Sequence, residues 1–471
     1  MKSVVIVGAG ISGLSIGYLL KNEVRRSGKD VEIRILESSD RVGGNIGTIQ
    51  EDGYLIERGP TGFLSKVPET LRLCKSLGIL NRVVVSSDTS RYRYIYKDNM
   101  LHPLPTGPVS LFSSKIITWQ IIKPFLREFR IHPGNAELEE TVAGFFSRRL
   151  SREIVDDLVD PFISGVYAGD PDNLSIKSVF PKLYKWEQQY GSFIKGALKS
   201  REKKERFYDD EFPKLKRTKL LSFIGGMKDF IDALESALKN EIYKNTEARR
   251  LSCHPGSIPR YRIEARTKSG IKEYPADAVI LSLPAYTAAE LVTPLSEKLA
   301  SVLRGIPYAP IMVVGMGFRD LSHPLKGYGF LVPHSQKKQL LGCQWNSSIF
   351  LYRAPKNGAV LTCMLGGACN PDVVNLSDDQ LLSVSMKELG EIMNIPKSNV
   401  PAVVRIIRYA SGIPQYNIGH EERKFIIKQN QKDHPGLFCF GTYLDGIAVN
   451  DAAENAYNIL PDILHFLFHK K

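Results

Sequence analysis

A glycine-rich turn close to the N-terminus limits the fold of this chain more than any other feature. Residues 8–13 read Gly-Ala-Gly-Ile-Ser-Gly, directly after the β-branched run 4–7 and directly before an apolar stretch with helical spacing. Residues 31–37 then alternate at period two, as a half-buried strand does. A strand, a turn, a helix and a second strand in this order predict a βαβ unit at the start of a parallel sheet.

Each position of this turn has a physical role in binding a dinucleotide. Gly8 permits the tight turn, Gly10 lets the backbone approach a pyrophosphate, and Gly13 packs the helix on the strand. The helix N-terminus offers unpaired N–H groups and the positive end of its dipole to the phosphates. Glu37 ends the second strand, where its carboxylate can bind a ribose hydroxyl and disfavours a 2′-phosphate. The predicted nucleotide site therefore comprises Gly8, Ala9, Gly10, Ile11, Ser12, Gly13, Glu37 and Ser38.

Charge and size narrow the class of protein further. Lys and Arg number 63 against 50 Asp and Glu in 471 residues, a formal charge of +13 that indicates an anionic partner. The charged fraction of 24% and the aromatic fraction of 9% exclude a disordered chain. The length predicts about three structural units at roughly 150 residues each. A basic stretch at 195–219 is interpreted as a solvated loop.

The cysteines and the apolar runs indicate the compartment. Six cysteines are scattered without a CxxC pair or zinc-site spacing, so we expect a reducing interior and no metal. The N-terminal apolar run is too short for a signal peptide. The uncharged stretches 99–114 and 305–318 are shorter than a transmembrane helix needs. We therefore expect a cytoplasmic protein, with any membrane contact peripheral and on the inner face of the cytoplasmic membrane.

The residues after Glu37 carry a family resemblance. Residues 41–44 read Arg-Val-Gly-Gly, and the whole segment 8–44 resembles the FAD fingerprint of the amine oxidase and protoporphyrinogen oxidase group. Arg41 is expected to neutralise pyrophosphate charge there. No second complete GxGxxG follows, because position 320 is Asp after Gly315-Met316-Gly317. We therefore expect no separate NAD(P)H domain, and oxygen or another small acceptor for the electrons.

The resemblance extends along nearly the whole chain to the family of oxygen-dependent protoporphyrinogen oxidases. The matching segments are 56–60, 101–107, 164–170, 327–333, 364–367, 413–420 and 446–451. The family implies an α/β fold with three interleaved parts. These are a Rossmann-like FAD-binding domain, a mixed-sheet substrate domain, and a helical, membrane-associating domain. Their expected ranges are 1–85, 220–295 and 433–471 for FAD, 86–91, 206–219 and 296–432 for substrate, and 92–205 for the helices.

The resemblance also implies further site residues. On the cofactor side these are Arg41, Gly44, Asn45, Gly59, Pro60, Thr61, Gly62, Ala248, Tyr409, Ile447, Ala448 and Val449, with Tyr409 standing where many relatives carry Trp. For the substrate they are Arg93, Gly165, Tyr328, Gly329, Leu331 and Met364, with Arg93 expected to bind a propionate carboxylate. No side chain is assigned as catalytic, and His420 is interpreted as a loop histidine that satisfies local hydrogen bonds.

The activity that the resemblance implies is oxidation of protoporphyrinogen IX to protoporphyrin IX in haem biosynthesis. Six electrons would leave in three FAD cycles, with O2 as acceptor. No general base is required if the substrate relays its own protons. Expected partners are the porphyrinogen, O2 and an anionic membrane, without nucleic acid, and a homodimer fits the family.

Three alternative functions stay open. One is oxidation of coproporphyrinogen III by the same fold. Another is a flavin amine oxidase, although the loop 441–446 has neither the Trp nor the Cys that such enzymes place there. The last is a membrane-associated, FAD-binding scaffold without enzymatic activity.

Overall fold

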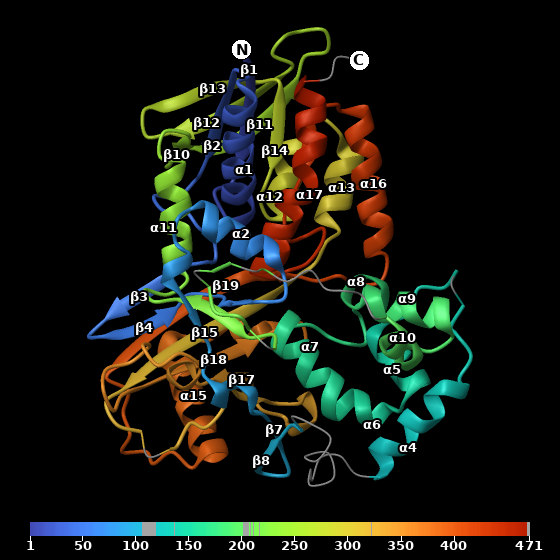
Figure 1. Cartoon of the computed structure of the whole chain (residues 1–471), viewed down its shortest axis with the longest axis vertical. Helices are drawn as coiled ribbons and strands as arrows, with labels where there is room; N and C mark the ends of the chain where they lie inside the picture. Colours follow the sequence, from blue (N-terminus) through green and yellow to red (C-terminus); the bar gives the residue numbers. More distant parts are fainter. Residues whose placement is uncertain are drawn as a thin grey trace.

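A parallel sheet of five short strands lies at the centre of the upper lobe in this computed structural model (Figure 1). The structure describes residues 1–105, 119–135, 137–200, 207, 209–210, 212–215, 217–321 and 323–468. In spatial order the strands are β10 (Ile242–Tyr243), β2 (Val31–Leu36), β1 (Lys2–Val7), β14 (Ala278–Leu281) and β20 (Leu437–Cys439). The predicted βαβ unit is present, and strands from both ends of the chain lie in one sheet.

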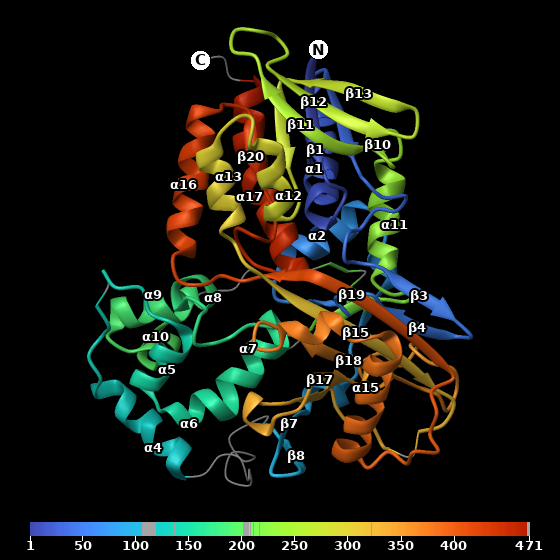
Figure 2. The ribbon, with the colours of Figure 1, turned by 180° about the vertical axis from the view of Figure 1, so that it is seen from behind.

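Two layers cover this sheet because both of its faces are apolar. In β1, Val4 and Ile6 pack into one core, and Val5 and Val7 pack into the other. The first layer holds α1 (Ile11–Ser27), α2 (Pro68–Ser76), α11 (Lys228–Ala237) and α17 (Val449–Phe468). The second holds the antiparallel strands β11 (Glu247–Cys253), β12 (Tyr261–Thr267) and β13 (Gly270–Ala276), with α12 (Ala285–Val292) and α13 (Glu297–Arg304). Figures 1 and 2 show α17, from the C-terminal end, beside α1 in this lobe.

A mixed sheet of seven strands forms a second body below the first (Figure 2). In spatial order its strands are β19 (Val403–Pro414), β15 (Tyr308–Phe318), β18 (Ala359–Gly366), β17 (Leu340–Gln344), β16 (Gly329–Leu331), β7 (Arg93–Lys97) and β8 (Met100–Pro103). All neighbours are antiparallel except β16 and β7. Helix α15 (Asp378–Met393) packs its apolar side on one face.

Short elements connect the two bodies. The hairpin of β3 (Thr48–Glu51) and β4 (Tyr54–Glu57) packs Tyr54 and Ile56 against Val360 and Val403 of the lower sheet. A small sheet of β5 (Phe63–Leu64), β9 (Leu220–Phe223) and β6 (Val83–Val85) lies beside it, and α14 (Asn346–Ile349) follows β17. These elements hold the upper lobe and the lower sheet in one arrangement.

Helices form the third body. They are α4 (Trp119–Arg127), α5 (Val142–Arg149), α6 (Arg152–Ile154), a π-helical turn (Val155–Val159), α7 (Asp160–Tyr167), α8 (Ile176–Val179), α9 (Pro181–Tyr190) and α10 (Phe193–Lys199). Helices α9 and α10 are separate, because Gly191 ends α9 in the left-handed region and Ser192 caps α10. In the described part of the chain, no helix has both the length and the apolarity needed to cross a bilayer. Residues 106–107 of one family segment, and parts of the basic stretch 195–219, lie outside the described residues.

Three segments differ from the predicted domain ranges. Strands β7 and β8 fall in the range 92–205 expected to be helical, yet they extend the lower sheet through pairing with β16. Helices α13 and α16 (His420–Asp433) fall in the range 296–432 expected for the substrate domain. Their side chains Leu299 and Ile427 pack in the core of the upper lobe, because that core needs an apolar cover on its second face.

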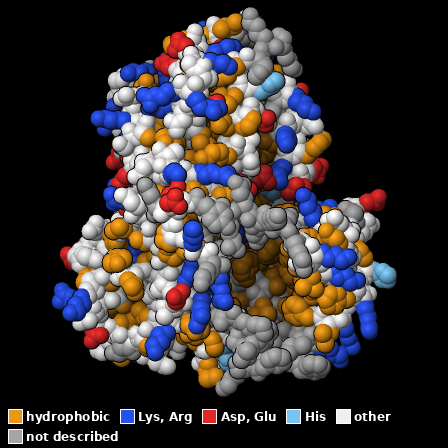
Figure 3. Space-filling model, viewed as in Figure 1, with side chains coloured by type: hydrophobic (Ala, Val, Ile, Leu, Met, Phe, Trp, Pro, Cys, Tyr) orange, Lys and Arg blue, Asp and Glu red, His pale blue; other side chains and the backbone are white. Residues whose placement is uncertain are grey.

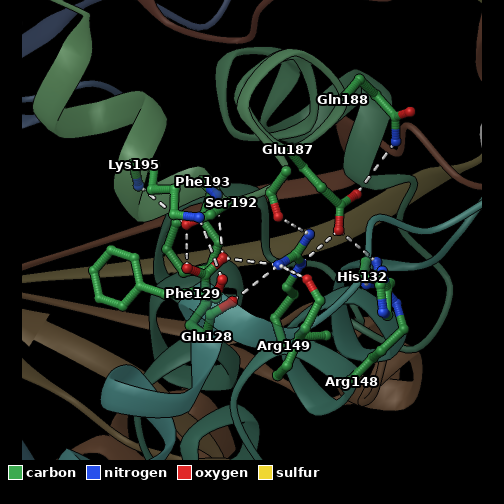
Figure 4. A network of polar contacts seen from close by, with 12 residues as sticks. Glu128, Phe129, His132, Arg148, Arg149, Glu187, Gln188, Ser192, Phe193 and Lys195 are labelled. Carbon is green, nitrogen blue, oxygen red and sulfur yellow. Dashed lines mark hydrogen bonds and ion pairs between the residues drawn. The ribbon is translucent and has the colours of Figure 1, made fainter.

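A buried ionic network joins the helices of the third body (Figure 4). The guanidinium of Arg149, which is fully buried, donates to Glu187 at 2.5 Å and to Glu128 at 3.1 Å. It also donates to the backbone oxygens of Ile131 at 3.0 Å and Gly191 at 2.9 Å. One side chain thereby connects α5, α9 and the turn after α4, and Arg148, which also pairs with Glu187, supplies a second positive charge for the two carboxylates.

Replacing Arg149 with Met should strongly destabilise the chain. Removing one member of a buried ionic network leaves carboxylates without compensation, which costs about 3–5 kcal/mol of unfolding free energy. Urea denaturation followed by circular dichroism measures this loss. The matched control is Arg26→Met, because the side chain of Arg26 is 80% exposed and pairs with Glu23 on the same helix. An equal shift of the two urea midpoints would contradict the assigned role of Arg149.

Candidate functional site

Of the three glycines in the turn between β1 and α1, Gly10 alone borders open space. A Cβ at Gly8, whose φ is +103°, would lie 2.4 Å from the backbone oxygen of Ser282. A Cβ at Gly13 would lie 2.0 Å from the backbone oxygen of Gly8. At Gly10 a Cβ would meet no described atom within 4 Å. Protein packing therefore explains Gly8 and Gly13, whereas Gly10 faces space in which a ligand can approach the backbone.

The helix that follows this turn has an open N-terminus. Among the described residues, no side chain caps α1 at Gly10, and its first turn carries no acidic residue. The first N–H groups of a helix have no partner within the helix. Together with Ile11 and Ser12, which begin α1, this end of the helix can bind an anionic group.

The second glycine loop lies directly against the first. Gly43 donates its N–H to the backbone oxygen of Ala9 at 2.8 Å and forms a parallel bridge with Gly10. A Cβ at Gly44 would lie 3.4 Å from the Cα of Gly10. The two loops thus form one continuous wall of backbone.

Arg41 supports this second loop from within. Its guanidinium donates to backbone oxygens at 2.5 Å, 3.3 Å and 3.4 Å, which belong to Gly44, Ile46 and Val42. From the sequence we expected Arg41 to neutralise the charge of a pyrophosphate, and we did not anticipate its hydrogen bonds to the backbone of its own loop. The backbone carbonyls that it binds carried no signal in the sequence.

Glu37 also connects neighbouring backbone segments. Its Oε2 accepts the N–H of Ala9 at 2.9 Å, and its Oε1 accepts the N–H of Ser39 at 2.9 Å and the hydroxyl of Ser38 at 3.3 Å. Oε1 also accepts the hydroxyl of Ser39 at 2.8 Å, whereas Oε2 accepts one hydrogen bond from the described residues, so Oε2 keeps a lone pair for a ligand hydroxyl. The backbone oxygen of Glu37 accepts the N–H of Thr246, which brings β11 and Ala248 next to it.

A third loop, residues 59–62, meets the second one under a tyrosine of the lower sheet. A Cβ at Gly59 would lie 2.5 Å from the backbone oxygen of Asn45. Tyr409 of β19 donates its hydroxyl to the backbone oxygens of Arg58 at 3.1 Å and Asn45 at 3.4 Å. Burial raises the pKa of Tyr409, so the hydroxyl stays protonated and remains a donor. Tyr409 therefore joins the lower sheet to both loops.

The remainder of the third loop contacts the lower sheet and β9. Thr61, one residue after Pro60, donates its hydroxyl to Oε1 of Gln344 at 2.6 Å. A Cβ at Gly62 would lie 2.2 Å from the backbone oxygen of Leu221. Gln344 was not anticipated from the sequence, because a glutamine in a strand carries no sign of its partner.

The C-terminal loop ends at the N-terminus of α17. Gly446 has φ +71°, and Asp451 accepts the N–H of Ala448 at 2.9 Å just before the helix begins at Val449. Burial raises the pKa of Asp451. Ile447 packs against the core of the helical body, so this loop touches that body as well.

His420 and Tyr416 hold the C-terminal loop in place. Their rings stack with centroids 4.3 Å apart, and the backbone oxygen of Leu444 lies 3.0 Å from Nε2 of His420. Burial lowers the pKa of His420, so the imidazole is neutral and donates through Nε2. Tyr416 donates its hydroxyl to the backbone oxygen of Thr442. These contacts fit the interpretation of His420 as a locally bonded histidine.

A separate group of residues lies on the lower sheet. Arg93 begins β7 and pairs with Gly329 of β16, and its guanidinium lies 5.1 Å from the ring centroid of Tyr328. Burial raises the pKa of Tyr328, which keeps its hydroxyl neutral. Within the described ranges, Arg93 pairs with no carboxylate, and its side chain is exposed. It is therefore a cation ready for an external anion.

Apolar side chains surround this group. A Cβ at Gly165 of α7 would lie 2.4 Å from Leu331, so the glycine allows the helix to approach the sheet. Met364 of β18 packs in one cluster with Tyr409. Figure 3 shows a hollow lined by apolar side chains between the lower sheet and the helical body. A flat, largely apolar molecule with an acidic group suits such surroundings.

Two contacts join the glycine loops to the group of residues around Arg93 on the lower sheet. Thr61 reaches Gln344, which stands opposite Gly329 in the sheet, and Tyr409 shares its cluster with Met364. Searched over the described residues, the structure holds no group of three or more His, Cys, Asp or Glu side chains that could bind a metal ion. The site is therefore built from backbone loops, one exposed arginine and apolar walls.

Known proteins resemble this chain over its whole length. A relative from Bacillus subtilis, a coproporphyrinogen III oxidase, is 29% identical and covers 99% of both chains. A chloroplastic protoporphyrinogen oxidase from Nicotiana tabacum is 31% identical over 98% of this chain and 85% of its own. A crystal structure from Exiguobacterium sp. 255-15, described as a protoporphyrinogen oxidase, superposes with a TM-score of 0.80 at 25% identity, covering 98% of each chain.

A family model adds the decisive comparison. The model of the flavin-containing amine oxidoreductases matches residues 11–458, from the first residue of α1 to the first half of α17. Together with the relative from Nicotiana tabacum, this match shows that the chain belongs to the family of flavin-containing amine oxidoreductases.

Proposed function

We propose that this chain oxidises protoporphyrinogen IX to protoporphyrin IX with FAD as cofactor and O2 as electron acceptor. The observation that carries the proposal is the exposed Arg93, without a carboxylate partner among the described residues, on strand β7 beside β16, whose Gly329 stands opposite the Gln344 that binds Thr61 of the third loop. A propionate-bearing macrocycle offers the anion and the apolar surface that these surroundings fit. The porphyrinogen-oxidising relatives support the same substrate class.

We propose the three glycine loops and the C-terminal loop as the place for FAD. The open space at Gly10 and the uncapped start of α1 suit the pyrophosphate, and the remaining acceptor capacity of Glu37 suits the ribose. Gly59, Tyr409 and the loop 447–449 lie toward the lower sheet, where the ring system must reach the substrate. When bound, FAD supplies two-electron acceptance from a substrate carbon.

The residues of this chain would act by placement. Arg93 binds a carboxylate and so fixes how the macrocycle lies, while Leu331 and Met364 exclude water from its face. Holding one substrate through three rounds of two-electron oxidation accounts for the six electrons removed. Each O2 that takes two electrons and two protons leaves as hydrogen peroxide. No side chain needs to act as a general base, because the substrate can relay its own protons.

Coproporphyrinogen III is the second candidate substrate. The relative from Bacillus subtilis, which covers 99% of both chains, favours it. This porphyrinogen carries two carboxylates more than protoporphyrinogen IX.

We also propose a peripheral contact between the helical body and an anionic bilayer. Leu126 and Leu138 are 62% and 68% exposed, and the basic residues Arg127 and Arg130 stand beside them. Each basic side chain near an anionic surface contributes about 1 kcal/mol.

A competition assay tests the choice of substrate. Purified protein loaded with FAD receives equal amounts of protoporphyrinogen IX and coproporphyrinogen III, and fluorescence of the separated porphyrins reports each product. We expect a higher kcat/KM for protoporphyrinogen IX. The opposite preference would assign the coproporphyrinogen activity instead. Turnover of amines without any porphyrin product would overturn the proposed function.

Two glycine substitutions separate the cofactor site from the fold. Gly10→Ala should leave the stability of the apoprotein unchanged and weaken FAD binding at least about tenfold, because its Cβ enters ligand space only. Gly13→Ala should lower the melting temperature of the apoprotein, because its Cβ meets the backbone of Gly8. Flavin absorbance per mole of protein and a thermal melt measure both effects. A Gly10→Ala variant that keeps its full flavin content would show that the pyrophosphate does not bind at this turn.

Replacing Arg93 with Ala should raise KM for the porphyrinogen about tenfold with little change in kcat. A charge-assisted hydrogen bond contributes about 1.5–3 kcal/mol, and the lower value applies because Arg93 is exposed. Arg91→Ala is the matched control, since Arg91 lies on the neighbouring turn and donates to the Tyr92 hydroxyl at 2.6 Å. An unchanged KM in the Arg93→Ala variant would show that the substrate carboxylate does not bind at Arg93.

A further inference from the structure

A buried arginine outside the residues assigned above reaches the third glycine loop, residues 59–62. Arg353 follows α14, and its side chain is 1% exposed. Its Nη2 lies 3.0 Å from Oε1 of Glu57 and donates to the hydroxyl of Ser222 at 2.6 Å. One nitrogen of the guanidinium therefore binds a carboxylate on β4 and a hydroxyl on β9, two strands that are distant in the sequence.

Both partners of Arg353 lead to the same loop. Glu57 is the last residue of β4 and stands two positions before Gly59. Ser222 donates its hydroxyl to the backbone oxygen of Thr61 at 3.0 Å. Arg353 thus holds the entry to the loop through the ion pair with Glu57 and the far side of the loop through one hydroxyl.

Further hydrogen bonds fix the carboxylate of Glu57. Its Oε2 accepts the hydroxyl of Thr48 at 2.6 Å, and its Oε1 accepts the backbone N–H of Met227 at 3.0 Å. Thr48 begins β3, and Met227 is the residue before α11. The carboxylate therefore has a single position, and it holds Nη2 of Arg353 at one place between the two bodies.

Burial opposes both charges of this ion pair. It raises the pKa of Glu57 to about 7 and lowers the pKa of Arg353. A buried ion pair contributes little net stability, because the lost hydration offsets the attraction between the charges. Nε and Nη1 of Arg353 also have no hydrogen-bond partner among the described residues. What the buried guanidinium supplies is therefore the direction of its two contacts at Nη2.

We propose that Arg353 is a positioning residue for the flavin, which acts through Glu57 and Ser222 on the third glycine loop. The proposal rests on the placement of FAD along the glycine loops given above. Thr61 is bound at its backbone oxygen by Ser222 and at its hydroxyl by Gln344, so its part of the loop has one orientation. Because the loop is ordered before the cofactor binds, binding of FAD avoids the cost of ordering it.

Ser222→Ala tests the link between Arg353 and the loop while the ion pair with Glu57 stays in place. The matched control is Ser385→Ala, because Ser385 is equally buried and donates its hydroxyl to the backbone of Leu381 in its own helix. Each protein carrying FAD is diluted stepwise, and the fluorescence of released FAD gives the dissociation constant. We expect a rise of about fivefold for Ser222→Ala, as for one hydrogen bond, and no change for Ser385→Ala.

A second variant tests whether Arg353 acts through Ser222. Arg353→Lys keeps a cation beside Glu57 but lacks the planar guanidinium, so it should also raise the FAD dissociation constant about fivefold. The control is Arg405→Lys, because the partly exposed Arg405 pairs with Glu51 of the same hairpin and should leave the constant unchanged. The double variant Ser222→Ala with Arg353→Lys should bind FAD no more weakly than the weaker single variant, since both break one chain of contacts.

The possible outcomes separate this role from the placement of FAD. Circular dichroism checks the folding of each variant, and if Arg353→Lys does not fold, Ser222→Ala decides. Unchanged FAD binding by folded Ser222→Ala, or losses that multiply to about 25-fold in the double variant, would refute the role of Arg353. Normal binding by Gly10→Ala would instead contradict the placement of the cofactor and, with it, this proposal. No porphyrinogen is used, so the result is independent of the substrate.

Discussion

The site depends on one close approach between two stretches of backbone. The turn at 8–13 lies against the loop at 43–44, and no side chain of the described residues stands between Gly10 and Gly44. This wall of backbone can approach a phosphate because it carries almost no side chains. Its other contacts keep the two stretches in register: Arg41 braces one loop, Glu37 ties the turn to the end of β2, and Tyr409 anchors the next loop to the lower sheet.

The local part of this arrangement could be predicted from the sequence. Strand β1, helix α1, strand β2 and the position of Glu37 follow from apolar periodicity and from the glycine spacing, which act over a few residues. The break between α9 and α10 also has a local cause, because Gly191 ends one helix and Ser192 caps the next. The FAD cofactor and the flavoenzyme family were confirmed by comparison, because the resemblance covers nearly the whole chain.

Contacts between distant segments could not be predicted in the same way. Arg149 and its partner Glu187 are 38 residues apart, and each alone resembles a surface charge. Strand β7 joins its sheet through β16, more than 200 residues later in the chain, so its range was interpreted as part of the helical body. Arg41 binds backbone carbonyls, which every residue carries and which therefore leave no mark in a sequence.

The packing of α17 on α1 has a consequence for the order of events during synthesis. The apolar face of α1 leaves the ribosome with the first 27 residues, but its cover in α17 begins only at Val449. Strand β20, at the edge of the same sheet, also comes late. The upper lobe therefore cannot close before α17 has been synthesised, and α1 stays exposed until then. A polypeptide interrupted before Val449 would carry the glycine turn without a closed lobe around it.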